Sequence, residues 1–366
     1  MDPRVKKLAR VIARYSLGLK KGQVVQIVGE PAALPLIKAM NNEVIDLGAQ
    51  PVVDLSIPDN EEYMLKHGSD QQLKFLQPWA RLKVSKIDAY VVFLGGENTR
   101  YLASVDPKKQ AQVRLNRKKI MDLFYRRVEK KELRWCLTLF PTISAAQEAD
   151  MSLIDYEDFV YGAGHLGAAD PVKHWLKVRK EQARLVKILN RIDQLHFRAE
   201  GTDLKLRVKG RKWVNCAGEN NFPDGEIFTG PIENSAEGTI RYTFPAIFMG
   251  KEVEDITLTF KKGKVVDFSA AKNEAHLKSM IELDRGAKYI GEVAIGTNYD
   301  IKTFTKNILF DEKLGGTCHL ALGNSFAETG SKNKSSLHWD MICDLKKGGE
   351  IIADGKTIYR NGKFLI

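Results

Sequence analysis

Cysteine is scarce in this chain of 366 residues, and its four cysteines stand far apart. No pair has the Cys-x-x-Cys spacing of a zinc ribbon or a dithiol redox motif, and the dispersed positions do not suggest a disulfide framework. Cys318 adjoins His319, but on a strand these two side chains should point to opposite faces. We therefore expect reduced, buried thiols at Cys136, Cys216, Cys318 and Cys343.

Long apolar runs are also missing. No uninterrupted stretch approaches the ~20 residues of a membrane helix, and the opening MDPRVKKLARVIARY has no apolar signal-peptide core. Instead, Val5, Leu8, Ile12 and Tyr15 repeat at helical spacing, so we expect this segment to belong to the fold. With 43% apolar and 28% charged residues, the composition is that of a globular protein. We predict a cytoplasmic protein without a membrane segment.

Acidic residues are outnumbered, which gives the chain a net charge of +11. Much of the excess lies in residues 100–135, where twelve basic residues accompany four acidic ones. A basic helix can bind nucleic acid, but Phe124, Tyr125 and Trp135 form no stacking pattern and no helix-turn-helix or RNA-binding signature is present. We interpret the segment as a solvated helix face. A noncatalytic protein that binds through it is kept as an alternative.

A nucleotide-binding motif in its proper context is missing as well. Gly162, Gly164 and Gly167 match the pattern G-x-G-x-x-G. That fingerprint follows a strand and opens a helix at once, whereas residues 168–171 separate these glycines from the next helical stripe. The sequence therefore does not predict a dinucleotide cofactor.

The length of the chain makes two domains the default. In the first half, helical stripes alternate with short apolar runs, as in βα units around a mostly parallel sheet. These runs lie near residues 24–29, 51–55, 89–96 and 134–140. A charged helix over 174–195 precedes mostly short strand signals. We predict an α/β N-terminal domain over residues 1–170 and a strand-rich α+β C-terminal metal-binding domain over residues 171–366.

Carboxylates and imidazoles recur in the second half of the chain, in strand-like segments beside glycines. The set comprises Glu226, Glu292, Glu312, His319, His338 and Asp340. His338 and Asp340 are two residues apart, so on a strand they share a face, while Leu337, Trp339 and Met341 take the other. Each residue alone has an ordinary explanation as a turn, surface or core residue. Together they suit a metal site.

The charge of this set favours two divalent metal ions. Four carboxylates carry four negative charges, which two divalent cations would cancel with both imidazoles neutral. Without metal, clustered carboxylates repel one another. Oxygen and nitrogen donors without thiolate suit zinc, cobalt, manganese or iron better than calcium. A metal-dependent hydrolase is the leading interpretation.

Four ordered blocks of this sequence resemble the aminopeptidase T and aminopeptidase S family of metallopeptidases. The blocks are TDLKLRVKGRKWVNCAGENNFPDGEIFTGP, DRGAKYIGEVAIGTN, NILFDEKLGGTCHLALGNSF and KNKSSLHWDMICDL. The opening of the chain is also similar, so the resemblance covers nearly its whole length. It implies that the six residues named above are the metal ligands. It further implies a homodimer whose active sites face an enclosed cavity.

The resemblance also implies the reaction, which is hydrolysis of the N-terminal bond of short peptides by water activated between two metal ions. Zinc or cobalt is expected first, with manganese or iron as alternatives. We hypothesise that Glu226 and Glu292 are catalytic, with Glu292 bridging the ions and Glu226 or Glu312 passing a proton to the leaving amine. A carboxylate-rich pocket would favour a free, cationic N-terminus.

One position departs from the family pattern. Phe326 stands where well-known members have a tyrosine, whose hydroxyl could donate a hydrogen bond to the oxyanion of the reaction. Phenylalanine cannot donate this bond. A dinuclear metallohydrolase that acts on another amide or ester is therefore the alternative function.

Overall fold

The computed structural model describes residues 2–366, which form two compact units. The first unit comprises residues 2–172 with Gly218–Pro223, and the second comprises Lys173–Ala217 with Asp224–Ile366. The short segment of the first unit thus comes from the second half of the chain. The domain boundary after residue 170 stays a prediction.

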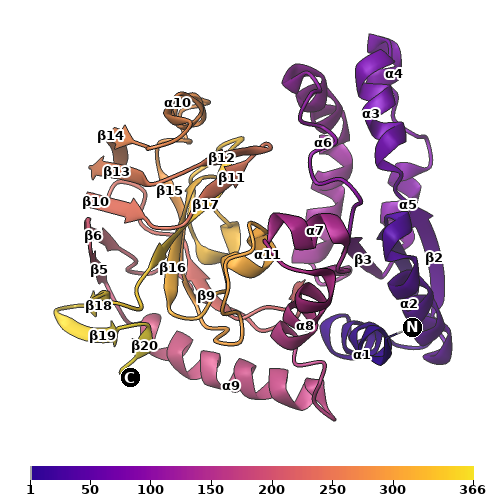
Figure 1. The fold of residues 1–366 in the computed structure, drawn as a ribbon, viewed down its shortest axis with the longest axis horizontal. Coiled ribbons are helices and arrows are strands. Elements are labelled where there is room, and N and C mark those ends of the chain that lie inside the picture. Colours follow the sequence, from indigo (N-terminus) through magenta and orange to yellow (C-terminus); the bar gives the residue numbers. More distant parts are fainter. Residues whose placement is uncertain (1) are drawn as a thin grey trace. The chain divides into compact units, whose positions relative to one another are not determined.

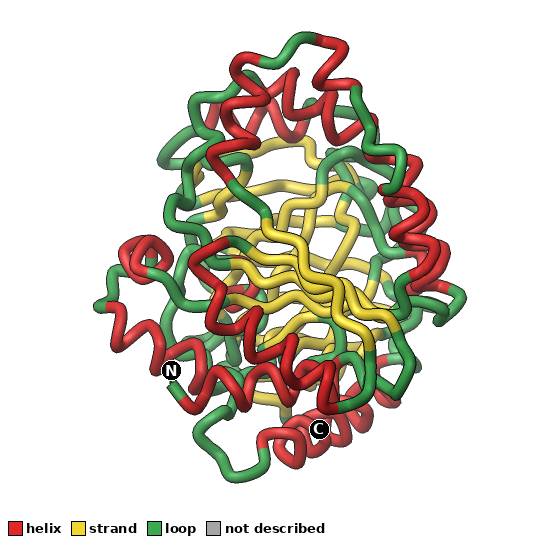
Figure 2. The backbone as a smooth tube through the Cα atoms, turned by 90° about the vertical axis from the view of Figure 1, so that its right-hand side faces the viewer, coloured by secondary structure: helices red, strands yellow, loops and turns green. Residues whose placement is uncertain are grey.

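The first unit contains a parallel five-stranded sheet in the order β2-β1-β3-β4-β8. Of these strands, β2 and β3 are labelled in Figure 1. Its strands are β1 (Val24–Gly29), β2 (Gln50–Leu55), β3 (Ala89–Leu94), β4 (Arg134–Leu139) and β8 (Asn221–Phe222). The four predicted apolar runs are the first four of these strands. The predicted α/β class with βα units is confirmed. Figure 2 distinguishes the helices (red) of the molecule from its strands (yellow).

The first helix of this unit precedes β1, and the others lie between or after its strands along the chain. They are α1 (Pro3–Val11) with the π-helical turn Ile12–Ser16, the 3₁₀ turn Pro31–Ala33, α2 (Leu34–Asp46), α3 (Pro58–His67), α4 (Asp70–Lys74), α5 (Ala80–Lys86), α6 (Pro107–Glu129), α7 (Ile143–Glu148) and α8 (Leu153–Ala163). The basic segment forms α6, which Asp106 caps by accepting from the backbone N–H of Lys108. Within residues 2–366, no helix is both long and apolar enough for a bilayer.

The glycine pattern begins in one helix, and the charged helix expected from the sequence forms another. Gly162 and Gly164 lie at the C-terminal end of α8, not after a strand, so the glycine pattern lacks the setting of a dinucleotide site. The helix predicted over 174–195 is α9 (Pro171–Leu189), which ends earlier because the chain from Gln194 onward pairs as a strand.

The second unit is built mainly from antiparallel strands. Its larger sheet has the order β14-β13-β10-β6-β5-β18-β19-β20. These strands are β5 (Gln194–Ala199), β6 (Thr202–Arg207), β10 (Glu237–Tyr242), β13 (Ile256–Lys261), β14 (Lys264–Ser269), β18 (Glu350–Ala353), β19 (Lys356–Arg360) and β20 (Lys363–Phe364). The remaining short elements are β11 (Ala246–Phe248), β12 (Lys251–Val253), α10 (Glu274–Ile281), α11 (Ile308–Asp311) and the 3₁₀ turn Ala327–Thr329. The predicted strand-rich class is confirmed.

The smaller sheet of this unit has the antiparallel order β17-β16-β15-β9-β7. Its strands are β7 (Val214–Cys216), β9 (Glu226–Thr229), β15 (Ile290–Gly296), β16 (Thr317–Gly323) and β17 (His338–Asp344), which we call the site sheet. One face of the site sheet packs into the main core with residues of the larger sheet. The core side chains of that face include Ile227, Val293, Ile295, Cys318, Leu320, Trp339 and Met341. Cys318 therefore faces away from His319, as predicted.

Hydrogen bonds to Asp284 connect the segments that precede two strands of the site sheet, β15 and β17. Asp284, before β15, accepts backbone hydrogen bonds from Gly286, Ala287 and Ser336 at 2.9, 2.9 and 2.7 Å. Its two oxygens also accept from the Ser335 hydroxyl at 2.8 and 3.0 Å. Burial acts to raise the pKa of Asp284, but these hydrogen bonds lower it below its usual value. The carboxylate thus joins the segment before β15 to the segment before β17.

Replacing Asp284 with asparagine should lower the free energy of unfolding by about 2 kcal/mol at neutral pH, because hydrogen bonds to a charged group are lost. Since the pKa is lowered in the folded state, the loss should be complete above the ordinary value of 3.8 and should shrink as the pH falls below it. Urea unfolding at several pH values measures it. Asp267→Asn, at an exposed position, is the control; equal losses in both variants would contradict the role of Asp284.

Candidate metal centre

The second face of the site sheet carries five of the six predicted ligands. Glu226 opens β9, Glu292 lies on β15, His319 on β16, and His338 and Asp340 on β17. The register pairs Glu226 with Gly296, His319 with Ala294, Asp340 with Ala321 and His338 with Gly323. Glycine and alanine therefore occupy the positions between the polar side chains. A Cβ at Gly296 would stand 2.2 Å from the Leu314 carbonyl oxygen, and one at Gly323 2.2 Å from that of Leu337, so close backbone packing requires glycine at both positions.

The polar atoms stand at spacings that suit shared metal ligation. His319 Nε2 lies 3.4 Å from Glu226 Oε2 and 3.5 Å from Glu292 Oε1. His338 Nε2 lies 3.4 Å from Glu292 Oε2 and 3.5 Å from Asp340 Oδ2. These distances are long for hydrogen bonds. Two ligand atoms on a tetrahedral ion with bonds of about 2.1 Å stand about 3.4 Å apart.

Glu292 occupies the middle of this arrangement. One of its oxygens faces His319 and the other faces His338. The strand bulges between Ile290 and Glu292, and such a bulge can re-aim a side chain. A carboxylate with each oxygen turned to a different imidazole has the arrangement of a bridging ligand.

The sixth predicted ligand comes from outside the sheet. Glu312 is the C-cap of α11, whose first turn is capped by Asn307. The next residue, Lys313, has a side chain with no exposed surface, and its ammonium contacts the carboxylates of Glu312 and, at 3.5 Å, Glu226. Burial would lower the pKa of Lys313, but the neighbouring carboxylates hold it well above its usual range. The structure thus brings all six residues together and adds a lysine.

Burial and opposite charges compete throughout the cluster. Burial would lower the pKa of His319, but the carboxylates of Glu292, Glu226 and Asp340 raise it to about 9. In the same way Asp340 and Glu292 raise the pKa of His338 to about 10 against the effect of burial. Burial raises the pKa of Asp340 itself to about 6. Burial also acts to raise the pKa of Glu292, but the neighbouring imidazoles of His319 and His338 lower it to about 2.

Several polar atoms of the cluster are buried without any hydrogen-bond partner in residues 2–366. They are Glu226 Oε2, both ring nitrogens of His319, and Asp340 Oδ1. Buried polar atoms are normally satisfied, because desolvation without a bond is costly. The cluster contains two groups of three ligand atoms, and the atoms of each group lie within 4.8 Å of one another. The groups are Glu226/Glu312/His319 and Glu292/His319/Asp340. Divalent metal ions would satisfy Glu226 Oε2, His319 Nε2 and Asp340 Oδ1, so the residues present fit a metal centre.

A backbone carbonyl orients one of the imidazoles. His338 Nδ1 lies 2.8 Å from the carbonyl oxygen of Asn324, which fixes the ring so that Nε2 faces the cluster. Gly291 packs against the same carbonyl, because a Cβ at this position would stand 2.3 Å from it. Gly291 also lies in the bulge beside Glu292. The glycine therefore governs the orientation of two predicted ligands.

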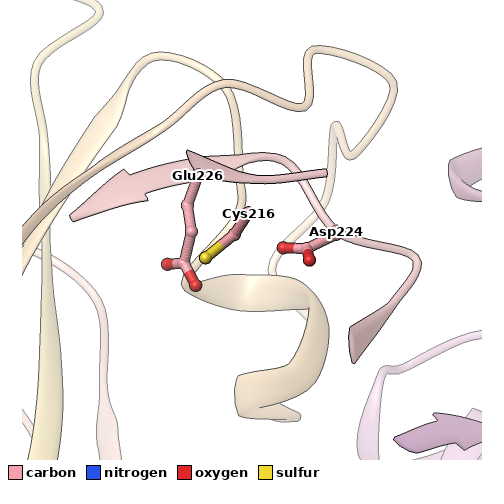
Figure 3. A group of neighbouring side chains, drawn as sticks. All are labelled: Cys216, Asp224 and Glu226. Atoms are coloured by element: carbon pink, nitrogen blue, oxygen red, sulfur yellow. The ribbon is translucent and has the colours of Figure 1, made fainter. Parts of the chain in front are cut away.

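Sequence reasoning missed three residues beside the cluster. Cys216 and Asp224 form a further group with Glu226, and Figure 3 shows the Cys216 sulfur between the two carboxyl groups. Burial, together with the charges of Asp224 and Glu226, raises the pKa of the Cys216 thiol well above its usual range. Lys313 is the third. Its signal was the string Asp-Glu-Lys, in which the lysine directly follows a predicted ligand.

The cysteine predictions can be compared with the structure. All four cysteines are free, as predicted. Cys136, Cys318 and Cys343 are buried, whereas Cys216 is partly exposed as a residue although burial desolvates its thiol.

Phe326, where the family pattern has tyrosine, borders the site. Its ring centroid lies 5.1 Å from that of His338 and 5.4 Å from that of Phe228, with edge-on contacts to both. The side chain is 41% exposed, so the ring can contact a bound molecule. It offers apolar surface there and no hydrogen-bond donor.

The composition and burial of the cluster are those of a metal-binding protein. The sequence profile of the thermophilic metalloprotease (M29) family matches residues 1–364, so the chain belongs to that family. The predicted family resemblance and the predicted hydrolase class are confirmed by this match.

Individual proteins extend the comparison. Aminopeptidase AmpS of Bacillus subtilis (strain 168) is 26% identical, with 97% of each chain covered. The structure of wild-type AmpT from Thermus thermophilus is similar with a TM-score of 0.87 at 22% identity, covering 99% of both chains. A 2,5-dihydroxypyridine dioxygenase from Pseudomonas putida KT2440 also has a similar fold, with a TM-score of 0.59 at 14% identity over 99% of this chain and 96% of that one. The fold alone therefore does not determine the reaction.

Replacing Gly291 with alanine should weaken divalent-metal binding by 10- to 100-fold, the usual cost of disturbing an outer partner of a ligand. The added Cβ would collide with the Asn324 carbonyl and so shift both Glu292 and His338. Zinc titration of chelator-treated protein measures the change. Gly162→Ala, where a Cβ meets nothing within 4 Å, should bind zinc like the wild type. Unchanged zinc affinity in G291A would contradict this account of the ligand geometry.

Proposed function

We propose that the protein is an aminopeptidase that hydrolyses the N-terminal bond of short peptides with a free amino group. Family membership supplies the class, metalloprotease. The observation that carries the proposal is the ligand cluster, in which imidazoles and carboxylates of the site sheet converge at 3.4 to 3.5 Å. The similarity to a protein named aminopeptidase supports the choice of the terminal bond.

The proposal includes two divalent ions, zinc or cobalt first and manganese or iron as alternatives. Glu226, Glu312 and His319 would hold one ion, and His338, Asp340 and Glu292 the other, with Glu292 as the bridge. Of the three groups of clustered ligand atoms in the described part of the chain, two lie within the six ligands and support this number. When bound, such ions lower the pKa of a water molecule and polarise the peptide carbonyl.

The side chains would carry out the remaining steps. Glu226 and Glu292 are the catalytic carboxylates of the proposal, and Glu226 or Glu312 would pass a proton to the leaving amine. The side chain of Glu312 is 15% exposed and that of Glu226 7%, which favours Glu312 as the group within reach of the amine. Carboxylate oxygens that face the substrate would favour a cationic peptide N-terminus over a blocked one.

The larger organisation is part of the same proposal. Residues 171–366 would form the catalytic domain, because they contain all six ligands, and residues 1–170 would form a separate α/β domain. A homodimer and a cytoplasmic location, both predicted from the sequence, complete it. Neither nucleic acid nor a membrane is a proposed partner.

Glu292→Gln should reduce kcat/KM for an unblocked peptide by at least about 10³-fold, because loss of a bridging ligand should exceed the cost of losing an outer partner. The far-UV circular dichroism should not change. Release of leucine, lysine and other residues is measured after chelation and after return of zinc, cobalt or manganese separately. The exposed variant Glu282→Gln is the control. Near-normal turnover in E292Q would remove Glu292 from the site.

The same assay separates the two hydrolase functions when N-acetylated peptides are included. Metal-restored cleavage confined to unblocked peptides supports the aminopeptidase. Failure to cleave any peptide, in protein that binds metal, would overturn it in favour of a hydrolase of another amide or ester. Phe326 is the observation that favours this second candidate, because it removes a possible oxyanion donor beside His338.

Phe326→Tyr should raise kcat on unblocked peptides by about tenfold or more, because the added hydroxyl can donate to the developing oxyanion. Steady-state kinetics give kcat and KM separately. Phe326→Leu keeps an apolar side chain without the hydroxyl and should show no gain. A gain of equal size in both variants would indicate relief of crowding instead of oxyanion stabilisation.

A further inference from the structure

Lys313 is a buried cation inside the ligand cluster. Its side chain has no exposed surface, and its ammonium contacts Glu226 Oε1 at 3.5 Å and the carboxylate of Glu312. A buried ammonium without an opposite charge is strongly unfavourable. The two carboxylates therefore hold the ammonium in place, and the ammonium holds them together.

The same two carboxylates belong to one of the two groups of clustered ligand atoms. We call the group of Glu226, Glu312 and His319 the Glu226 position, and the group of Glu292, His319 and Asp340, with His338 beside it, the Glu292 position. Across residues 2–366, the ion pairs of Glu292 and Asp340 are with histidines only. Each position thus has two carboxylates, but only the Glu226 position has an ammonium in contact with both.

Resting on the proposed two-ion function, we propose that Lys313 is a built-in cation that makes the two metal positions unequal. The Glu292 position binds a divalent transition-metal ion tightly. The Glu226 position takes its ion only at higher free metal, because that ion competes with Lys313 for the carboxylates of Glu226 and Glu312.

Two physical effects produce this inequality. The ammonium cancels one of the two negative charges at the Glu226 position, so a divalent ion gains less attraction there. An entering ion also repels the ammonium at short range in surroundings that water does not screen. If Lys313 moved aside, it would leave its two ion pairs while still buried. At the Glu292 position no ammonium has to be displaced, and the imidazoles there become ligands when they release a proton.

Equilibrium dialysis against buffered zinc, followed by elemental analysis, tests the proposal on the whole chain. Wild-type protein should bind one zinc per chain in a first phase and a second with an affinity at least about 100-fold lower, which is a difference of two decades in free zinc. Cobalt absorption in a parallel titration should show the same two phases. Glu312→Gln should weaken the second phase and leave the first.

Lys313→Met and Lys313→Gln should bring the second zinc to within about tenfold of the first, because the competing charge is gone. Lys313→Arg keeps the charge and should behave like the wild type. Lys306→Met, a partly buried lysine that pairs with Glu252 at 3.6 Å outside the cluster, is the matched control. Circular dichroism with zinc present verifies that each variant is folded.

The outcomes separate this proposal from the function on which it rests. Two zinc ions of equal affinity in the wild type would overturn the role of Lys313 without any variant. The proposal would also be overturned if the two zinc affinities differed in the wild type and the difference were just as large in folded K313M or K313Q. A wild-type chain that binds no zinc, or that binds it and cleaves no peptide, would instead contradict the proposed aminopeptidase.

Discussion

Desolvation of clustered carboxylates is the constraint on which the second unit depends. Glu226 and Glu292 are almost fully buried on one face of the site sheet, and Asp340 lies beside them. Such a group is stable only with positive charge nearby. Lys313 and the two imidazoles supply part of that charge. The orphaned atoms of His319 and Glu226 mark where the protein alone does not complete it.

The site sheet makes this cluster possible because one of its faces is apolar and packs in the core, while the other carries the ligands. The side chains that alternate with the ligands, such as Val293 and Trp339, pack in the core with the larger sheet. That packing fixes the register, and a slip of one residue would exchange the apolar and polar faces. The energy that holds the ligands together therefore comes mostly from the opposite face. Gly291, at the bulge, sets the orientation of the ligands beside it, and Asp284 joins the segments that precede β15 and β17.

Local periodicity accounts for what the sequence could predict. The His-x-Asp pair of His338 and Asp340 had to share a face of a strand, and the apolar runs of the first half had to be strands between helices. Gly218–Pro223 could not be assigned to the first unit, because its two-residue strand β8 is defined by pairing with β4. The contact of Lys313 with Glu226 could not be predicted from the sequence either. It joins residues 87 positions apart and depends on how α11 meets the sheet.

Lys313 also changes the charge argument for the metal centre. Counting the four carboxylate ligands alone gives four negative charges, which two divalent ions balance. With the ammonium included, the cluster has three, so two divalent ions leave one positive charge in excess. An anionic group or the carboxylate of Asp224, which acts on Lys313 electrostatically, can balance this excess. A single ion, with both imidazoles neutral, would leave one negative charge. Neither occupancy is neutral by ligands alone, so free metal concentration and the charge of the bound molecule together should decide which one prevails.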